Sequence, residues 1–223
     1  MRLGRLQLQL ERLRRTVPSD KTMGLLNIFR KPPAVRELRE LAGFIDENAA
    51  FVAQKGIFEY SRARAGHYAK VLFNEPTFLE ALERSRWRAF PLGLAMLGEL
   101  ADGVLRTHAS GDLDGGQDGL RALVLSVFDG YPVPAALGTT DWRQERDQLK
   151  RRLQLFGAEP PKRSFEIPDP YAHDYFNLMP IHEKLRARDF PTMHNYLKLT
   201  LCHMHIDLTK RIDGPALASA LND

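Results

Sequence analysis

The sequence predicts an all-α protein: an irregular multi-helix bundle of about seven to nine helices with a basic N-terminal tail. Apolar residues recur at spacings of three and four along most of the chain, which is the period of an amphipathic helix. No segment alternates apolar and polar residues as a half-buried strand does, and the sequence shows neither a hairpin signal nor an internal repeat. Hydrophobic residues make up 43% of the 223 residues and charged residues 27%, so the chain should fold around a core.

Residues 1–33 are expected to form a basic amphipathic tail. Apolar residues recur at helical spacing in its first segment, at Leu3, Leu6, Leu10, Leu13 and Val17. Residues 1–31 carry eight Lys and Arg against two acidic residues, so the rest of the chain is slightly acidic despite a formal net charge of +4. Nucleic-acid binding is usually marked by a basic face on the folded body. Because the basic charge of this chain lies in the tail, nucleic acid is not an expected partner. Met23 reads like a natural start, which leaves open the interpretation that residues 1–22 precede the true start codon.

The main helical domain is expected over residues 34–157. Pro91 lacks the backbone N–H that continues a helix, so it is expected to end or kink one. Residues 120–128 are too apolar for a surface helix and are expected near the centre of the core. The expected helices are residues 34–73 (two consecutive helices or one long bent one), 76–91, 92–105, 120–128, and a helix capped by Thr140 or Asp141 that ends at Phe156 before Gly157.

A proline-rich strap is expected at residues 158–170, because four prolines favour extended backbone over helix. It is also the expected boundary between the main domain and C-terminal helices, over residues 171–223, that pack on it. Those helices are expected at residues 171–178, 180–188 and 189–213.

The motifs that the sequence lacks bear on its function. The lone cysteine, Cys202, cannot form an intramolecular disulfide, and the first 30 residues lack a secretory apolar core, so a cytoplasmic location is expected. No apolar run approaches the roughly 18 residues that cross a bilayer. The sequence also has no phosphate-binding glycine loop before a lysine and no Gly-x-Ser-x-Gly elbow. The leading interpretation is therefore a non-enzymatic helical adaptor or regulatory protein with an unidentified protein partner and no cofactor.

Residues 23–31 are expected to give this adaptor a peripheral contact with an anionic membrane surface, at the cytoplasmic face of a membrane. Apolar side chains would insert into the interface while Arg30 and Lys31 meet the headgroups. The inserted residues would be Leu25, Leu26, Ile28 and Phe29. The alternative is a helix docked on the protein's own core.

Two segments, residues 59–68 and 84–88, are denser in arginine and aromatic residues than a solvated face requires. Arginine forks bind carboxylates and phosphates, and aromatic rings stack beside them. The candidate ligand- or partner-binding residues are Arg62, Arg64, Arg84, Arg86, Trp87 and Arg88. The alternative is a set of interhelical ion pairs, with Glu59, Glu80, Glu83 or Glu99 as partners and Trp87 in the core.

Five of the seven histidines lie between His173 and His205. On the final long helix, at about 100° per residue, His194, Lys198, Cys202 and His205 share one stripe. Imidazole and thiolate are good zinc ligands. The alternative function is therefore a metal- or small-ligand-binding helical enzyme that uses His194, Cys202, His205 and His182. His203 and Asp207 lie on the opposite side, where the carboxylate could orient the imidazole. Polar residues hydrogen-bonded within the fold would explain the same pattern without a metal.

Glu99 and Asp102 interrupt an otherwise apolar helix. They lie three residues apart on one helical face. A buried carboxylate would have a raised pKa unless it were paired. An exposed polar stripe explains both residues without catalysis, and this is the favoured interpretation.

Overall fold

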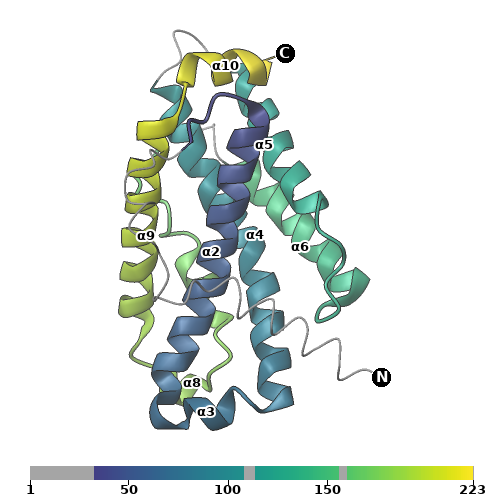
Figure 1. The fold of residues 1–223 in the computed structure, drawn as a ribbon, viewed down its shortest axis with the longest axis vertical. Helices are drawn as coiled ribbons and strands as arrows, with labels where there is room; N and C mark the ends of the chain where they lie inside the picture. The colour runs from purple at the N-terminus through teal and green to yellow at the C-terminus, as the bar shows by residue number, and fades with distance from the viewer. Residues whose placement is uncertain (1–32, 108–113, 156–159, 223) are drawn as a thin grey trace. The chain divides into compact units, whose positions relative to one another are not determined.

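The computed structural model describes residues 33–107, 114–155 and 160–222. These residues are helical apart from turns, connections and one isolated parallel bridge, so the predicted all-α bundle is confirmed (Figure 1). Residues 34–223 form one compact unit. No helix in the described part of the chain is long and apolar enough to cross a membrane.

Two long helices, α2 (Leu38–Ala65) and α4 (Pro76–Arg106), pack alongside one another at the centre of this unit (Figure 1). Residues 34–73 thus contain one long helix, which ends before Gly66, where φ is +52° and no side chain is favoured. The 3₁₀ turn Gly66–Tyr68 and the short helix α3 (Ala69–Leu72) then reverse the chain direction.

Helix α4 continues through Pro91, so the prediction that one helix ends at this residue and another begins after it is wrong. Proline removes one backbone hydrogen bond, a cost of about 3 kcal/mol in a helix interior. Residues 89–102 are all buried, so apolar burial on every side of the helix opposes that cost. Two residues later, a Cβ on Gly93 would lie 2.9 Å from the carbonyl oxygen of Ala49, so glycine allows α2 and α4 to approach closely.

Helices α5 (Asp114–Asp129) and α6 (Gly138–Leu153) cover one side of the central pair. The expected burial of residues 120–128 is confirmed on one face by Leu120, Val124 and Phe128. Helix α6 begins at Gly138 without a side-chain cap, so the predicted cap at Thr140 or Asp141 is wrong. The backbone N–H groups of Leu137 and Gly138 both donate to Pro134 O, and this turn leads directly into the helix. Helix α6 ends at Leu153 with Gln154 as its C-cap, so the predicted continuation to Phe156 is wrong, and Phe156 and Gly157 themselves lie outside the described residues.

Residues 160–163 have no regular secondary structure and residues 164–171 form successive turns, so the expectation of a fully extended strap is wrong. Ile167 and Tyr171 bury these turns against the core. The chain then forms α7 (Ala172–Asn177), α8 (Glu183–Arg186), α9 (Phe190–Arg211) and α10 (Gly214–Asn222). Helix α8 is shorter than the predicted 180–188, α9 matches its prediction closely, and α10 was not predicted.

A short parallel bridge joins the two ends of the body. The N–H of Val35 donates to Arg211 O at 2.9 Å, and the N–H of Asp213 donates to Val35 O at 2.8 Å. Val35 itself is buried. The segment before α2 is therefore fixed to the end of α9.

Candidate functional site

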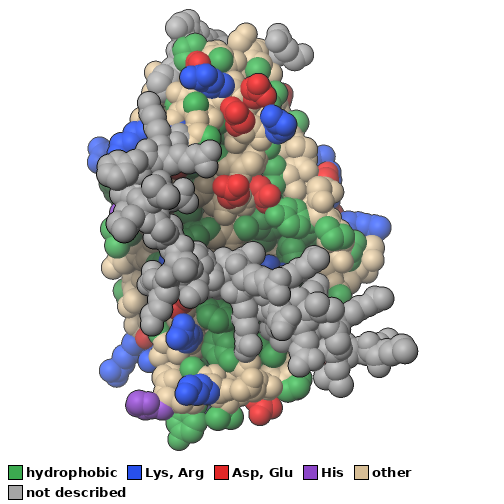
Figure 2. Space-filling model, in the orientation of Figure 1, with side chains coloured by type: hydrophobic (Ala, Val, Ile, Leu, Met, Phe, Trp, Pro, Cys, Tyr) green, Lys and Arg blue, Asp and Glu red, His purple; other side chains and the backbone are tan. Residues whose placement is uncertain are grey.

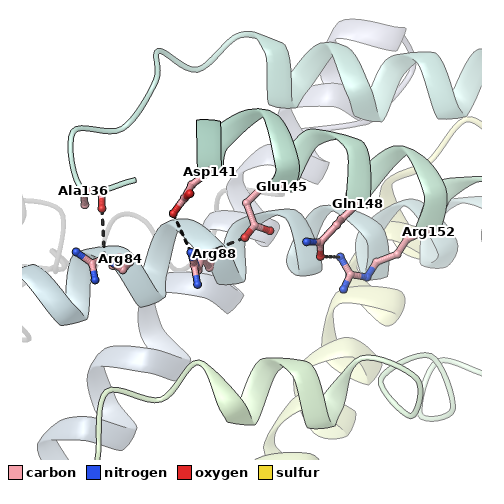
Figure 3. A network of polar contacts seen from close by, with 7 residues as sticks. All are labelled: Arg84, Arg88, Ala136, Asp141, Glu145, Gln148 and Arg152. Atoms are coloured by element: carbon pink, nitrogen blue, oxygen red, sulfur yellow. Dashed lines mark hydrogen bonds and ion pairs between the residues drawn. The ribbon is translucent and has the colours of Figure 1, made fainter. Parts of the chain in front are cut away.

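Arg84 and Arg88 lie along the contact between α4 and α6 (Figure 3). Arg88 Nη2 donates to Asp141 Oδ2 at 2.9 Å, and its Nε lies 3.7 Å from Glu145 Oε1. Arg84 Nε donates to the backbone oxygen of Ala136 at 3.4 Å. Two of the candidate binding residues thus connect α4 to α6 and to the turn that precedes it.

Trp87 belongs to an aromatic cluster between the same helices. Its ring lies 5.6 Å from Tyr131 and 5.8 Å from Trp142, in edge-to-face contacts. Arg86 covers the indole face at 4.4 Å while its Nη2 lies 2.8 Å from Glu83 Oε2. These contacts fit the alternative of interhelical ion pairs around a packed tryptophan, and a binding role for Arg84, Arg86, Trp87 and Arg88 stays a prediction.

The two candidate arginines of α2 lie at its C-terminal end. Arg64 Nε lies 2.7 Å from Asp189 Oδ2, and the Tyr60 hydroxyl donates to the same carboxylate at 2.8 Å. Burial, together with the negative charge of Asp189, raises the pKa of Tyr60. Arg62 is exposed. The end of α2 is therefore held against the junction of α8 and α9.

Glu99 and Asp102 are buried, so their interpretation as an exposed polar stripe is wrong. Lys162 Nζ donates to Glu99 Oε1 at 2.7 Å, and the Tyr171 hydroxyl donates to Oε2 at 3.2 Å. Arg106 Nε lies 2.9 Å from Asp102 Oδ2. Burial raises the pKa of Asp102, and the Arg106 guanidinium opposes that rise. The strap and α4 itself supply the cations that these carboxylates need inside the body.

The histidine stripe is divided among several partners. His194 Nε2 lies 2.6 Å from Asp169 Oδ1, and Lys198 Nζ lies 3.0 Å from the same oxygen. Burial acts to raise the pKa of Asp169, but the hydrogen bonds from Lys198 and His194 outweigh it and lower that pKa overall. Cys202 Sγ accepts from Ser164 Oγ at 3.5 Å.

The remaining members of the predicted metal site, His182 and His205, belong to different helices. His182 Nδ1 accepts from Lys184 N–H at 3.3 Å and caps α8, while His205 is half-buried on α9. The sequence suggested that the Asp207 carboxylate could orient His203. Instead, Asp207 Oδ2 accepts a hydrogen bond from Arg211 Nη1 at 2.6 Å. Over the described ranges, no three His, Cys, Asp or Glu side chains are grouped so that they could hold a metal ion.

Helix α9 carries apolar side chains on its solvent side, which sequence reasoning missed. Leu199 is 63% exposed and Ile206 is 48% exposed, and the two lie seven residues apart on one face. The opposite side of the helix buries Leu197 and Leu201. We call the solvent side the α9 outer face, and it comprises Asn195, Leu199, Cys202, His203 and Ile206.

A second surface, which the sequence predicted only in its 59–68 segment, lies at the end of the body where α3 and α8 are found (Figure 1). Figure 2 shows hydrophobic, basic, acidic and histidine side chains at that end. Tyr68, Val71 and Leu185 are 77%, 62% and 63% exposed. We call this the basic end surface, and it comprises Arg62, His67, Tyr68, Lys70, Val71, Lys184, Leu185 and Arg188.

The predicted membrane residues Leu25, Leu26, Ile28, Phe29, Arg30 and Lys31 lie outside the described residues, and their role stays a prediction. No protein-family model matches the chain, and comparisons with curated proteins and with solved structures give no significant match. Function must therefore be argued from the surfaces and contacts of this chain alone.

Proposed function

We propose that this protein is a non-enzymatic helical adaptor or regulatory protein that binds a helical segment of a partner protein through the α9 outer face. The supporting observation is the exposed pair Leu199 and Ile206, one above the other on a helix whose opposite side is already buried. A surface helix normally shows polar residues to solvent, and apolar anchors at i and i+7 are the pattern by which helices dock on one another.

The energetics of this face suit a reversible complex. Full burial of a leucine or isoleucine side chain contributes about 1.5 to 3 kcal/mol, and both residues already bury part of their surface in the free protein. Leu199 and Ile206 would together contribute about 2 to 3 kcal/mol on docking. Polar residues Asn195 and His203 border the apolar pair and supply the rim that an interface core requires.

The strap extends this face on one side. Ser164 contacts Cys202, and the next residue, Phe165, is 42% exposed, with Arg163 lying 5.9 Å over its ring. An aromatic side chain of this kind is a frequent anchor in protein interfaces. The lone cysteine also fits an adaptor that works in the reducing cytoplasm.

The test uses that cysteine as the attachment point for a photo-crosslinker. Cys202 lies between Leu199 and Ile206 on the α9 outer face and is the only cysteine of the chain, so a maleimide probe labels this face alone. Full-length labelled protein is irradiated in extract of its native cells. We expect one dominant adduct, which Leu199→Glu abolishes.

The matched control moves the probe to another helix. In the Cys202→Ser, Arg143→Cys variant the label sits on an exposed position of α6 and should not give the dominant adduct. Equal adducts from both positions, or an adduct that persists in Leu199→Glu, would contradict an α9 interface.

A further inference from the structure

The basic end surface brings together side chains from two distant parts of the sequence. The C-terminal end of α2, the following 3₁₀ turn and α3 supply one half, and α8 supplies the other. The ion pair between Arg64 and Asp189 joins the two halves, because Asp189 follows α8 directly at the start of α9. The surface is therefore one region of the fold, and it is distinct from the α9 outer face.

Its apolar members are unusually exposed. Tyr68 and Val71 lie three residues apart, and Leu185 lies on α8, each with well over half of its surface in solvent. The same end of the body also has packed apolar residues beneath, since Phe73 contacts both Phe58 and Phe78 in edge-to-face pairs. Tyr68 and Val71 thus belong to a segment that is anchored by packed aromatic residues, while their own side chains stay largely in solvent.

Charge is distributed unevenly between this end and the rest of the body. Residues 62–75 and 183–189 contain six Lys and Arg against Glu75, Glu183 and Asp189. Residues 34–223 as a whole are slightly acidic, because the tail holds more than the entire net charge of +4. An anionic surface would therefore attract this end and repel the remainder of residues 34–223.

We propose that the basic end surface docks on an anionic lipid membrane, with Tyr68, Val71 and Leu185 inserted into the interface and Lys70, Lys184 and Arg188 at the headgroups. Tyrosine places its ring among acyl chains and its hydroxyl among headgroups, and lysine and arginine reach headgroups along apolar stems. Basic side chains near an anionic leaflet strengthen such binding additively, and salt screens their contribution. The contact is peripheral and reversible.

This surface differs from the membrane contact expected of residues 23–31, and a test must separate the two. Full-length protein is sedimented with vesicles of phosphatidylcholine containing phosphatidylserine and with vesicles of phosphatidylcholine alone. We expect binding only to the anionic vesicles. Lys70→Glu with Lys184→Glu should lower the partition coefficient at least about tenfold, whereas the tail is unchanged in this variant.

A matched control carries the same change of charge elsewhere. Arg143→Glu with Lys150→Glu replaces two exposed basic residues of α6 and should leave the partition coefficient within about twofold of the unmodified protein. A second variant, Val71→Ser with Leu185→Ser, keeps every charge and should also weaken binding. Circular dichroism checks that each variant stays helical.

Several results would overturn the proposal. These are failure of the full-length protein to bind anionic vesicles, equal losses in the α3–α8 and α6 charge variants, and unchanged binding in both variants of the end surface. If only the variant Leu25→Ser with Ile28→Ser lost binding, the tail and not this end would bind the membrane. The α9 crosslinking result would not change in any of these cases.

Discussion

The middle of α4 and the solvent side of α9 depart in opposite ways from the usual pattern, in which apolar side chains are buried and charged ones are exposed. α4 places the carboxylates Glu99 and Asp102 inside the body, and α9 places Leu199 and Ile206 outside it. The buried carboxylates are paired with Lys162 and Arg106, so the fold itself explains them. The described residues give Leu199 and Ile206 no equivalent cover. Charge inside the body is thus a structural feature here, and apolar surface outside it is the better guide to function.

The largest effect that would test this comparison is expected at Arg106. The Arg106→Ala substitution leaves Asp102 buried without its ion-pair partner, and should lower the free energy of unfolding by about 3 kcal/mol. Urea denaturation at neutral pH measures it. The control is Arg143→Ala, an exposed arginine on α6, which should cost about 0.5 kcal/mol or less. An equal cost at both positions would show that the Asp102–Arg106 pair does not support the fold.

A smaller effect should appear in the pH dependence of stability. Because burial raises the folded-state pKa of Asp102 above its ordinary value of 3.8, the folded protein holds a proton that the unfolded chain has already released. The stability contributed by Asp102 should therefore fall as pH rises through the window above 3.8. Asp102→Asn should remove this slope in urea titrations between about pH 3 and pH 7.

Asp129, at the surface, should give a dependence of stability on pH with the opposite sign. The hydrogen bonds from Arg146 lower the pKa of Asp129 below 3.8, so its contribution is full above that value and is lost as pH falls through the lowered pKa. Asp129→Asn should therefore remove a slope of the opposite direction. Slopes of the same sign at the two residues would contradict the assignment of Asp102 as a buried acid.

The smallest effect on stability is expected on the α9 outer face. Leu199→Ala should change the free energy of unfolding by about 0.5 kcal/mol or less, because that side chain is mostly in solvent. Leu201→Ala makes the same change two residues further along the same helix, where the side chain is buried, and should cost about 3 kcal/mol. Similar costs at the two positions would mean that the described body already packs Leu199.

Much of the fold could be predicted from periodicity, because packing follows the apolar faces of the helices. The bounds of α9 and the burial of Leu120, Val124 and Phe128 followed from this pattern. The continuation of α4 through Pro91 could not, since the local preference of proline is overridden by burial of the surrounding residues.

The candidate surfaces were much harder to predict from the sequence. Glu99 contacts Lys162 and Tyr171, which lie far from it in the sequence, and no spacing along the chain predicts such contacts. On α9 the sequence drew attention to the stripe of histidines and did not single out the exposed Leu199 and Ile206. The basic end surface needs the order of helices in space, which brings α3 and α8 to one end.

The bridge at Val35 has a consequence for how the protein is made. Its partners, Arg211 and Asp213, come far later in the sequence than Val35, so the segment before α2 cannot take its final position until those residues have been synthesised. Until then, the apolar side of α2 lacks part of its cover. Truncation before residue 211 should therefore leave the segment before α2 without the partners that fix it to the end of α9.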